Sequence, residues 1–185
     1  MKHDKSPGSD GFTAEFFKVF WKDLGHFVVR SLNYGFTSGT MSVTQKQGLI
    51  TCIPKDNKPR HFLKNLRPLT LLNVIYKLAS GTIANRLKTI LDTLISKDQT
   101  GFIKGRYIGE NTRLLYDIMQ YTEDNNIPGL LMTIDFEKAF DTLEFDFIEK
   151  TLDYFNFGTT LKQWITLFLH NTLTAIQING FYQSL

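Results

Sequence analysis

The sequence predicts an α+β fold that is rich in helices and carries a small antiparallel sheet. Apolar residues recur with helical spacing in several segments, two β-rich runs flank a charged loop, and an Asn-Gly turn signal follows an alternating run near the end of the chain. With 185 residues, of which 42% are hydrophobic, the chain has material for about one domain with a sizeable core.

The first elements are a loop and a long helix. Ser6 to Gly11 combines the proline, glycine and aspartate residues that favour turns. Thr13 is a plausible N-cap for a helix that ends near Gly35, and the apolar side chains between them fall on one helical stripe.

Two strands joined by a basic loop are expected next. Gly48 to Ile53 is β-rich and stops at Pro54, and Leu66 to Leu71 is suited to be the returning strand. Cys52, the single cysteine, cannot form an internal disulfide, and we expect it to be a small buried hydrophobe. The tip of this two-stranded finger carries the basic residues Lys55, Lys58, Arg60 and Lys64.

Helices dominate the middle of the chain. Asn73 can cap a helix over roughly Val74 to Ile95, in which leucine and isoleucine recur with a helical period. A glycine-containing loop follows it. The next helix is expected near Asn111 to Asp124 and is broken by Pro128-Gly129.

The last third of the chain mixes strands and helices. Leu130 to Ile134 is a short apolar run bounded by a turn, which indicates a buried strand. Helical patterns lie near Glu144 to Phe155 and Leu161 to His170. Thr174 to Ile178 alternates like a strand and meets Asn179-Gly180, which predicts a hairpin.

Composition argues against several classes of protein. The aromatic content of 14% and the lack of polar low-complexity tracts argue against disorder. No run approaches the ~20 apolar residues of a membrane span, and the first residues lack the apolar core of a signal peptide. With one cysteine, these features predict a reduced intracellular protein of the cytoplasm or nucleus, with no membrane partner.

Charge is unevenly distributed along the chain. Residues 46–113 carry thirteen Lys/Arg against four Asp/Glu, a net of +9, whereas residues 114–185 carry three against ten, a net of −7. A basic region followed by an acidic one suits a polyanion-binding surface beside a cation-binding centre. Two solvated faces of opposite sign explain the same pattern, and charge alone favours that explanation.

A candidate metal ligand follows the predicted buried strand. Asp135 stands at its carboxyl end, which is the usual place for ligand or metal chemistry in open α/β sheets. Its hard oxygens suit Mg²⁺, the natural partner of a triphosphate; a turn or cap role is the alternative. Asp141 and Glu144 have the spacing of a capping box, so we expect Asp141 to cap a helix. From the residues alone, Phe140 is a core aromatic.

Four segments occur together in the order found in reverse transcriptases of LINE-type, non-LTR retrotransposons, which the chain therefore resembles. They are KSPGSDGFTAEFFK (5–18), LITCIPKDNKPRHFLKNLRPLTLLN (49–73), DQTGFIKGR (98–106) and TIDFEKAFD (133–141). The resemblance runs from about Lys5 to Gly180. Group II intron maturases share parts of this pattern but look less close.

The resemblance implies a right-hand polymerase of which the chain covers the fingers and an incomplete palm. Residues 1–113 would be fingers with some palm elements, and residues 114–185 the start of the palm. The implied activity is RNA-directed DNA polymerisation. The implied partners are an RNA template, a DNA primer and deoxynucleoside triphosphates, and the implied cofactor is Mg²⁺.

The resemblance also implies roles for particular residues. Asp135 would hold both catalytic magnesium ions, with the backbone carbonyl of Phe136 completing one coordination sphere. Phe140 would be the steric gate that excludes a ribose 2′-OH, and Lys55 and Arg67 would hold the incoming triphosphate. The positions implied to contact nucleic acid are Lys58, Arg60, Gln99, Gly101 and Arg106. For the loop that carries the last three, an ordinary glycine-rich connector is an equal alternative.

One departure from the family bears on activity. Reverse transcriptases need a second acidic motif, an aromatic residue followed within two positions by Asp-Asp, and this sequence contains no Asp-Asp dipeptide. One aspartate cannot neutralise and position two ions held ~3.5–4 Å apart. Ser9 also replaces a proline that is common in the first motif, a minor change in a turn.

The missing motif predicts a fragment that lacks the rest of the palm and the thumb and has no polymerase activity by itself. We expect an uncovered sheet edge, exposed apolar surface, and aggregation or molten behaviour. The alternative is a catalytically dead, polymerase-derived module that binds nucleic acid through its basic fingers. A scaffold without nucleic-acid contacts is a third hypothesis, which the ordered set of four motifs disfavours.

Overall fold

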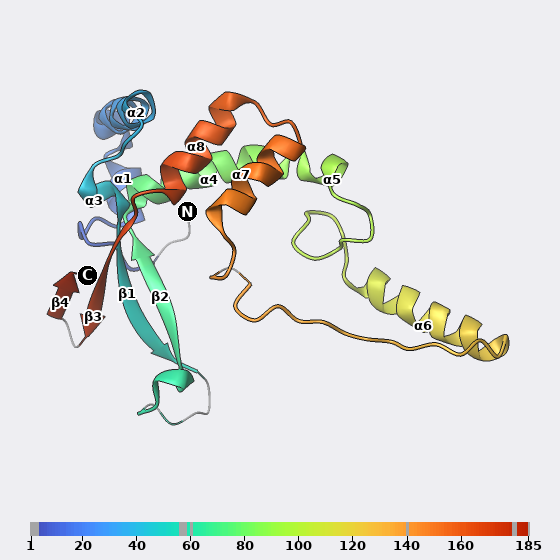
Figure 1. Ribbon diagram of the computed structural model, residues 1–185. Coiled ribbons are helices and arrows are strands. Elements are labelled where there is room, and N and C mark those ends of the chain that lie inside the picture. Colours follow the sequence, from blue (N-terminus) through green and yellow to red (C-terminus); the bar gives the residue numbers. More distant parts are fainter. Residues whose placement is uncertain (1–3, 56–58, 60, 140, 179–180, 185) are drawn as a thin grey trace. The chain divides into compact units, whose positions relative to one another are not determined.

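The computed structural model describes residues 4–55, 59, 61–139, 141–178 and 181–184, and its fold is α+β, as predicted (Figure 1). The chain forms two units. The first contains Met1–Ile83 and Phe157–Leu185, and the second contains Ala84–Asn156. The second unit therefore interrupts the first along the sequence.

A four-stranded sheet lies in the first unit, with the strand order β2-β1-β3-β4 (Figure 1). The strands are β1 (Gln47–Pro54), β2 (Leu66–Leu72), β3 (Leu173–Ile178) and β4 (Phe181–Ser184). β1 pairs antiparallel with β2, and β3 pairs antiparallel with β4, which confirms both predicted hairpins. The sheet is nevertheless mixed and not antiparallel throughout, because β3 runs parallel to β1.

The β1–β2 pair extends beyond the rest of the sheet as a two-stranded ribbon. β3 pairs with β1 only over Gln47 to Ile50, whereas β2 pairs with it as far as Pro54. Cys52 lies in the extension and is exposed, so the prediction of a buried cysteine was wrong. The reason is that a two-stranded ribbon leaves its side chains without a third layer to cover them.

The helices described in the first unit are α1 (Ala14–Val19), α2 (Trp21–Ser38), α3 (Val43–Lys46), α8 (Thr159–Leu169) and most of α4 (Val74–Lys88). Three of them, α1, α4 and α8, begin close to predicted positions, whereas α3 was not predicted. Thr13 caps α1, since its Oγ1 accepts a hydrogen bond from Phe16 N at 3.4 Å. The single helix predicted from Thr13 is instead interrupted at Phe20 and continues as α2 to a left-handed Gly39.

A small apolar core joins α1, α2 and α4. Phe17, Val28 and Val74 are buried together, and a second set of half-buried apolar side chains packs around them. Fully burying a side chain of this size stabilises the folded state by about 1.5–3 kcal/mol. The second set is Phe16, Leu32, Ile75 and Leu78.

The second unit is helical at both ends. After α4 it contains α5 (Leu91–Leu94), α6 (Gly109–Asp124) and α7 (Phe145–Tyr154). The helix predicted to continue to Ile95 ends at Lys88. Thr89 and Thr93 donate their hydroxyls to the carbonyls of the residues three positions before them, a local hydrogen bond that competes with a regular helix.

The segment between α6 and α7 departs from the prediction. Leu130 to Ile134 forms no strand, and Leu130 is 92% exposed, so the prediction of a buried strand was wrong. A buried strand needs a neighbour to pair its backbone groups, and no described strand pairs with this segment. The exposed apolar surface that we expected here is present.

The expected capping box is also absent. α7 begins at Phe145 with Glu144 as its N-cap, so Asp141 lies three residues too early to cap it. Asp141 instead closes a turn, with its N–H donating to Lys138 O at 2.7 Å. None of the described helices is long and apolar enough to cross a lipid bilayer.

Candidate nucleic-acid interface

The first motif and the end of β2 are joined by one buried amide. Asn73 is 2% exposed, and its Oδ1 accepts from Asp10 N at 3.3 Å and from Ser9 Oγ at 3.4 Å. Its Nδ2 donates to Thr44 O at 2.5 Å. A Cβ added at Gly8 would lie 2.0 Å from Asn73 Oδ1, so only glycine lets the two segments approach this closely.

The β1–β2 ribbon places Lys55 and Arg67 on one face. The strand register pairs Ile53 with Arg67, and a hydrogen bond from Lys55 N to Asn65 O at 2.8 Å continues it by two residues. Residues two apart on a strand point to the same side, so Lys55 and Arg67 are diagonal neighbours, about 7–8 Å apart at Cα.

The two cations of this face differ in their environment. Lys55 is half-buried, and its Nζ donates to Lys64 O at 2.7 Å, which leaves two of its three donors for other partners. Arg67 is exposed, and no residue in the described part of the chain bonds to its guanidinium. The face therefore offers several cationic N–H donors to an anion.

The tip of the ribbon is organised by Asn65, which is 8% exposed. Its Nδ2 donates to Pro59 O at 2.8 Å across the loop, and a short 3-10 turn, η1 (Leu63–Asn65), leads back into β2. The predicted contacts Lys58 and Arg60 lie outside the described residues.

The loop that begins with the sequence DQTGF (residues 98–106, the DQTGF loop) lies in the second unit and is held by Arg106, whose side chain is 11% exposed. Its Nε donates to Asp92 Oδ1 at 2.9 Å, and its Nη2 donates to the carbonyls of Asp92 and Ile95, each at 2.9 Å. Its Nη1 donates to Gln99 O at 2.7 Å and also to Ser96 O. All five N–H donors of the guanidinium are thus engaged, by α5, the turn after it and the loop.

Gln99 and Gly101 lie in the loop that Arg106 anchors. The side-chain amide of Gln99 donates to Gly101 O at 3.2 Å, and its backbone N–H donates to Ser96 O at 3.1 Å. The role predicted for Arg106, a phosphate contact, requires it to exchange one of these bonds. In this structure, Arg106 holds the loop against α5.

Asp135 and Phe136 lie in the extended segment between α6 and α7, and both are exposed. Phe140 lies outside the described residues. Within the described ranges, no three His, Cys, Asp or Glu side chains come together as a metal site. Asp135 and the Phe136 carbonyl alone do not fit the six-oxygen shell of Mg²⁺ without further ligands from outside these residues.

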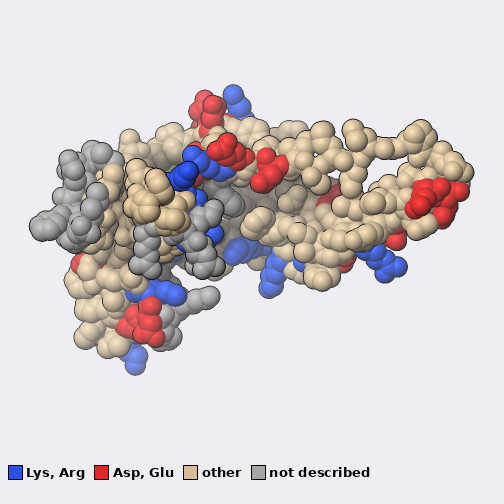
Figure 2. Space-filling view, turned by 90° about the horizontal axis from the view of Figure 1, so that it is seen from below, with Lys and Arg blue, Asp and Glu red and all other residues tan. Residues whose placement is uncertain are grey.

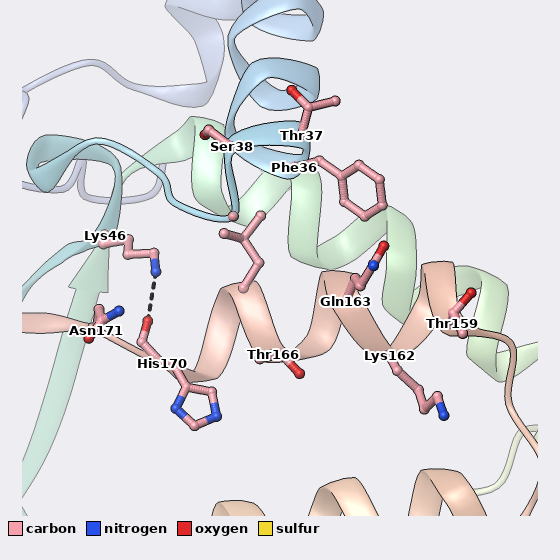
Figure 3. A pocket seen from close by; sticks show the side chains of 12 residues that line it. Phe36, Thr37, Ser38, Lys46, Thr159, Lys162, Gln163, Thr166, His170 and Asn171 are labelled. Carbon is pink, nitrogen blue, oxygen red and sulfur yellow. Dashed lines mark hydrogen bonds between the residues drawn. The ribbon is translucent and has the colours of Figure 1, made fainter.

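A pocket of about 740 Å³ lies between the end of α2 and α8, in the first unit (Figure 3). Lys46 lines it, is only 4% exposed, and donates from Nζ to His170 O at 2.6 Å. Burial lowers the pKa of Lys46 below its ordinary value of 10.5. The lysine stabilises the carboxyl end of α8, where the helix dipole favours a cation.

Figure 2 shows basic and acidic side chains interspersed on the described surface. The ribbon belongs to the first unit and the DQTGF loop to the second, and each carries basic residues of its own. Sequence reasoning missed the buried Lys46, because a lysine in the polar run TQKQG carries no signal of burial. It predicted Asn73 as a helix cap and missed the contacts of its side chain with Ser9, Asp10 and Thr44.

Comparison with known families agrees with the resemblance carried by the four motifs. The reverse transcriptase (RNA-dependent DNA polymerase) family matches residues 53–185, and the chain belongs to this family.

Two curated proteins are similar to the chain. It is 32% identical over 179 residues to "Transposon TX1 uncharacterized 149 kDa protein" of Xenopus laevis, a match that covers 97% of the chain and 14% of that protein. It is 33% identical over 104 residues to "Probable RNA-directed DNA polymerase from transposon BS" of Drosophila melanogaster, covering 55% of the chain and 11% of that protein. These findings confirm the predicted reverse transcriptase of a non-LTR retrotransposon, and the chain spans only a small part of either relative.

Proposed function

We propose that the chain supplies the fingers and the first part of the palm of an RNA-directed DNA polymerase, with residues 1–113 and 114–185 as the respective parts. The observation that carries this proposal is the shared face of Lys55 and Arg67 on the β1–β2 ribbon, inside the region that matches the family. Two cations held at a fixed spacing suit the phosphates of a nucleotide or a template.

Each cation has a distinct task in this proposal. Arg67 is exposed and grips two phosphate oxygens of an incoming deoxynucleoside triphosphate with its planar fork. Lys55 is tethered to the tip of the ribbon through Lys64 O, so its ammonium adds a point charge at a fixed place. Lys58 and Arg60 of the same loop are proposed to contact the nucleic-acid backbone. Phe140 is proposed as the steric gate.

Asp135, with the Phe136 carbonyl, is proposed as the magnesium-binding element of the complete polymerase. A metal there would neutralise charge on the triphosphate and orient it. The carboxylate is exposed in this chain and has no acidic neighbours that form a cluster in the described ranges. We therefore propose that the chain alone does not polymerise nucleotides.

Binding to a labelled RNA–DNA primer-template, measured by fluorescence anisotropy over a salt series, tests the ribbon. Each lost phosphate contact reduces the slope of log affinity against log salt by about 0.7–0.9. Lys55→Ala with Arg67→Ala should therefore lower the slope by up to about 1.4–1.8. Lys22→Ala, an exposed lysine of α2, is the control and should leave the slope unchanged. Equal slopes for all variants would refute a ribbon-mediated contact.

Primer extension on an RNA template tests activity. The purified chain, with Mg²⁺ and deoxynucleotides, should incorporate nothing. Templated incorporation that disappears in Asp135→Ala would show that the chain is an active polymerase after all.

A second candidate function is a nucleic-acid-binding module without catalysis. The exposed position of Asp135 on a segment that forms no strand favours it. The two candidates differ in Mn²⁺ binding, which broadens NMR signals of residues next to the ion. Broadening around Asp135 that Asp135→Asn abolishes supports the polymerase element, and its absence supports the binding module.

A further inference from the structure

Lys46 is a buried cation that has no acidic partner among the described residues. It is only 4% exposed, and lysine is almost never buried to this extent unless its charge is paired. Its ammonium donates to His170 O, and no carboxylate in the described part of the chain forms an ion pair with it. Burial lowers the pKa of Lys46, with no nearby anion to oppose that effect.

The carboxyl end of α8 compensates only part of this charge. A helix terminus carries roughly half of an elementary charge, whereas an ammonium carries a full one. Of the three N–H donors of an ammonium, His170 O accepts one, at 2.6 Å. Two donors and about half of the positive charge are therefore left for another partner.

The end of α2 borders the same space and does not take these donors. Ser38 Oγ donates to Gly35 O at 3.3 Å, and the N–H of Gly39 donates to Phe36 O at 3.3 Å. The helix thus satisfies these late carbonyls with donors of its own. No described carbonyl of α2 accepts a hydrogen bond from Lys46.

The pocket beside Lys46 has room for a small organic molecule. Its volume of about 740 Å³ lies within the ~300–1,000 Å³ that is usual for ligand sites. None of the described residues that line it is acidic. Asn171, which follows α8, adds an amide to the lining near the helix end where Lys46 donates (Figure 3). This end of the pocket therefore offers N–H donors to an anion.

Farther along α8 the lining is apolar. Phe36 and Leu167 line this part, and Leu167 is only 5% exposed. The ring of Phe36 stacks on Trp164, with ring centroids 4.8 Å apart and an interplanar angle of 22°, which fixes its orientation. Figure 3 shows Phe36 beside the middle of α8, away from Lys46 at the end of that helix. The pocket thus combines a cationic end with an aromatic one.

We propose that this pocket binds a small aromatic monocarboxylate. Its carboxylate accepts hydrogen bonds from the Lys46 ammonium and the Asn171 amide, and its ring packs against Phe36. A single negative charge is the best match, because a dianionic phosphate would leave a second negative charge buried without a cation. The site lies apart from the residues of the ribbon and requires neither nucleic acid nor a metal ion.

Isothermal titration calorimetry of the whole chain with 1-naphthylacetate and with the neutral 1-naphthylacetamide tests the role of the charge. The two probes share a ring and nearly the same shape, and the carboxylate should bind at least about tenfold more tightly. Lys46→Met should lower the affinity for the carboxylate by roughly 10- to 150-fold, the range for a hydrogen bond to a charged group, and should make the two affinities similar. Lys22→Met, at an exposed lysine of α2 that does not line the pocket, is the matched control and should change neither affinity.

Two further titrations test the aromatic end and the kind of anion. Phe36→Leu should weaken both probes by roughly 2- to 10-fold and leave the ratio of their affinities unchanged, because it removes a ring contact and no charge. 1-Naphthyl phosphate should bind more weakly than 1-naphthylacetate. Tighter binding of the phosphate would overturn the assignment of a monocarboxylate.

Reductive methylation of the unaltered chain gives an answer that does not depend on how a variant folds. With formaldehyde and cyanoborohydride, followed by peptide mass spectrometry, saturating 1-naphthylacetate should slow the methylation of Lys46 and not that of Lys22. Equal methylation of Lys46 with and without the carboxylate would overturn the proposal. Equal affinity of the unaltered chain for the carboxylate and the amide would also overturn it, and either result would leave the ribbon contacts of the proposed function intact.

Discussion

The buried amide of Asn73 gives a quantitative test of the fold. Replacement by alanine removes hydrogen bonds to three groups: Ser9 Oγ, Asp10 N and Thr44 O. A hydrogen bond contributes about 0.5–1.5 kcal/mol net, so the three together are worth about 3 kcal/mol. That is a large part of the ~5–15 kcal/mol by which a typical domain is stable.

Urea unfolding followed by tryptophan fluorescence measures this loss in the first unit alone, because both tryptophans, Trp21 and Trp164, lie there. We expect Asn73→Ala to lose about 3 kcal/mol in the free energy of unfolding. Asn85→Ala, an exposed asparagine of the same helix, should lose nothing, since alanine is the better helix former.

A loss below about 1 kcal/mol for Asn73→Ala would refute the claim that this amide joins the first motif to the sheet. Gly8→Ala is a second test of the contact between the first motif and Asn73. Its new Cβ would lie 2.6 Å from Asn73 N and 2.7 Å from Leu72 C, backbone atoms that cannot yield, as well as near the amide oxygen. The two substitutions should therefore be non-additive in a double-mutant cycle.

Three further predictions concern other parts of the chain. The pKa of Lys46 is lowered in the folded state, so the folded protein loses the ammonium proton of Lys46 at a lower pH than the unfolded chain does. The free energy of unfolding should therefore rise with pH as the pH approaches 10.5, and Lys46→Met should lack this rise. Parallel pH profiles of the two proteins would contradict the lowered pKa of Lys46. His170 and Lys162, which line the same pocket, are unchanged in the variant. Tyr76, whose pKa is raised by burial, is also unchanged, so it contributes equally to both pH profiles. Arg106→Lys keeps the charge but not the five-donor fork, so the amides of residues 96–105 should exchange faster with solvent; unchanged exchange would show that the fork does not hold the loop. In hydrogen exchange, amides of residues 129–136 should exchange at nearly unprotected rates, whereas those paired between β1 and β2 should be slowed. Equal protection of the two would contradict the exposed segment.

Local patterns predicted most of the elements. Alternating and β-branched residues placed β1, β2 and β3, and helical periodicity placed α6, α7 and α8 within a few residues. Thr13 was correctly predicted as a cap because its hydroxyl acts on a neighbouring amide. These features depend on residues that are close in sequence, which is the information that a pattern contains.

What failed depends on partners distant in sequence. Leu130 to Ile134 has the composition of a buried strand, but no described strand pairs with it, so it lies exposed. Lys46 is buried because α8, far along the chain, offers the carbonyl of His170.

The parallel pairing of β1 with β3 has a consequence for biosynthesis. The register pairs Gln47 with Leu173, so β1 can pair with β3 only after the 126 residues from Gly48 to Leu173 have been translated. At about 5–20 residues per second this delay is on the order of ten seconds. During that interval the edge of β1 that later pairs with β3 is open, in addition to the outer edge of β2, and chaperones that shield such edges would act then.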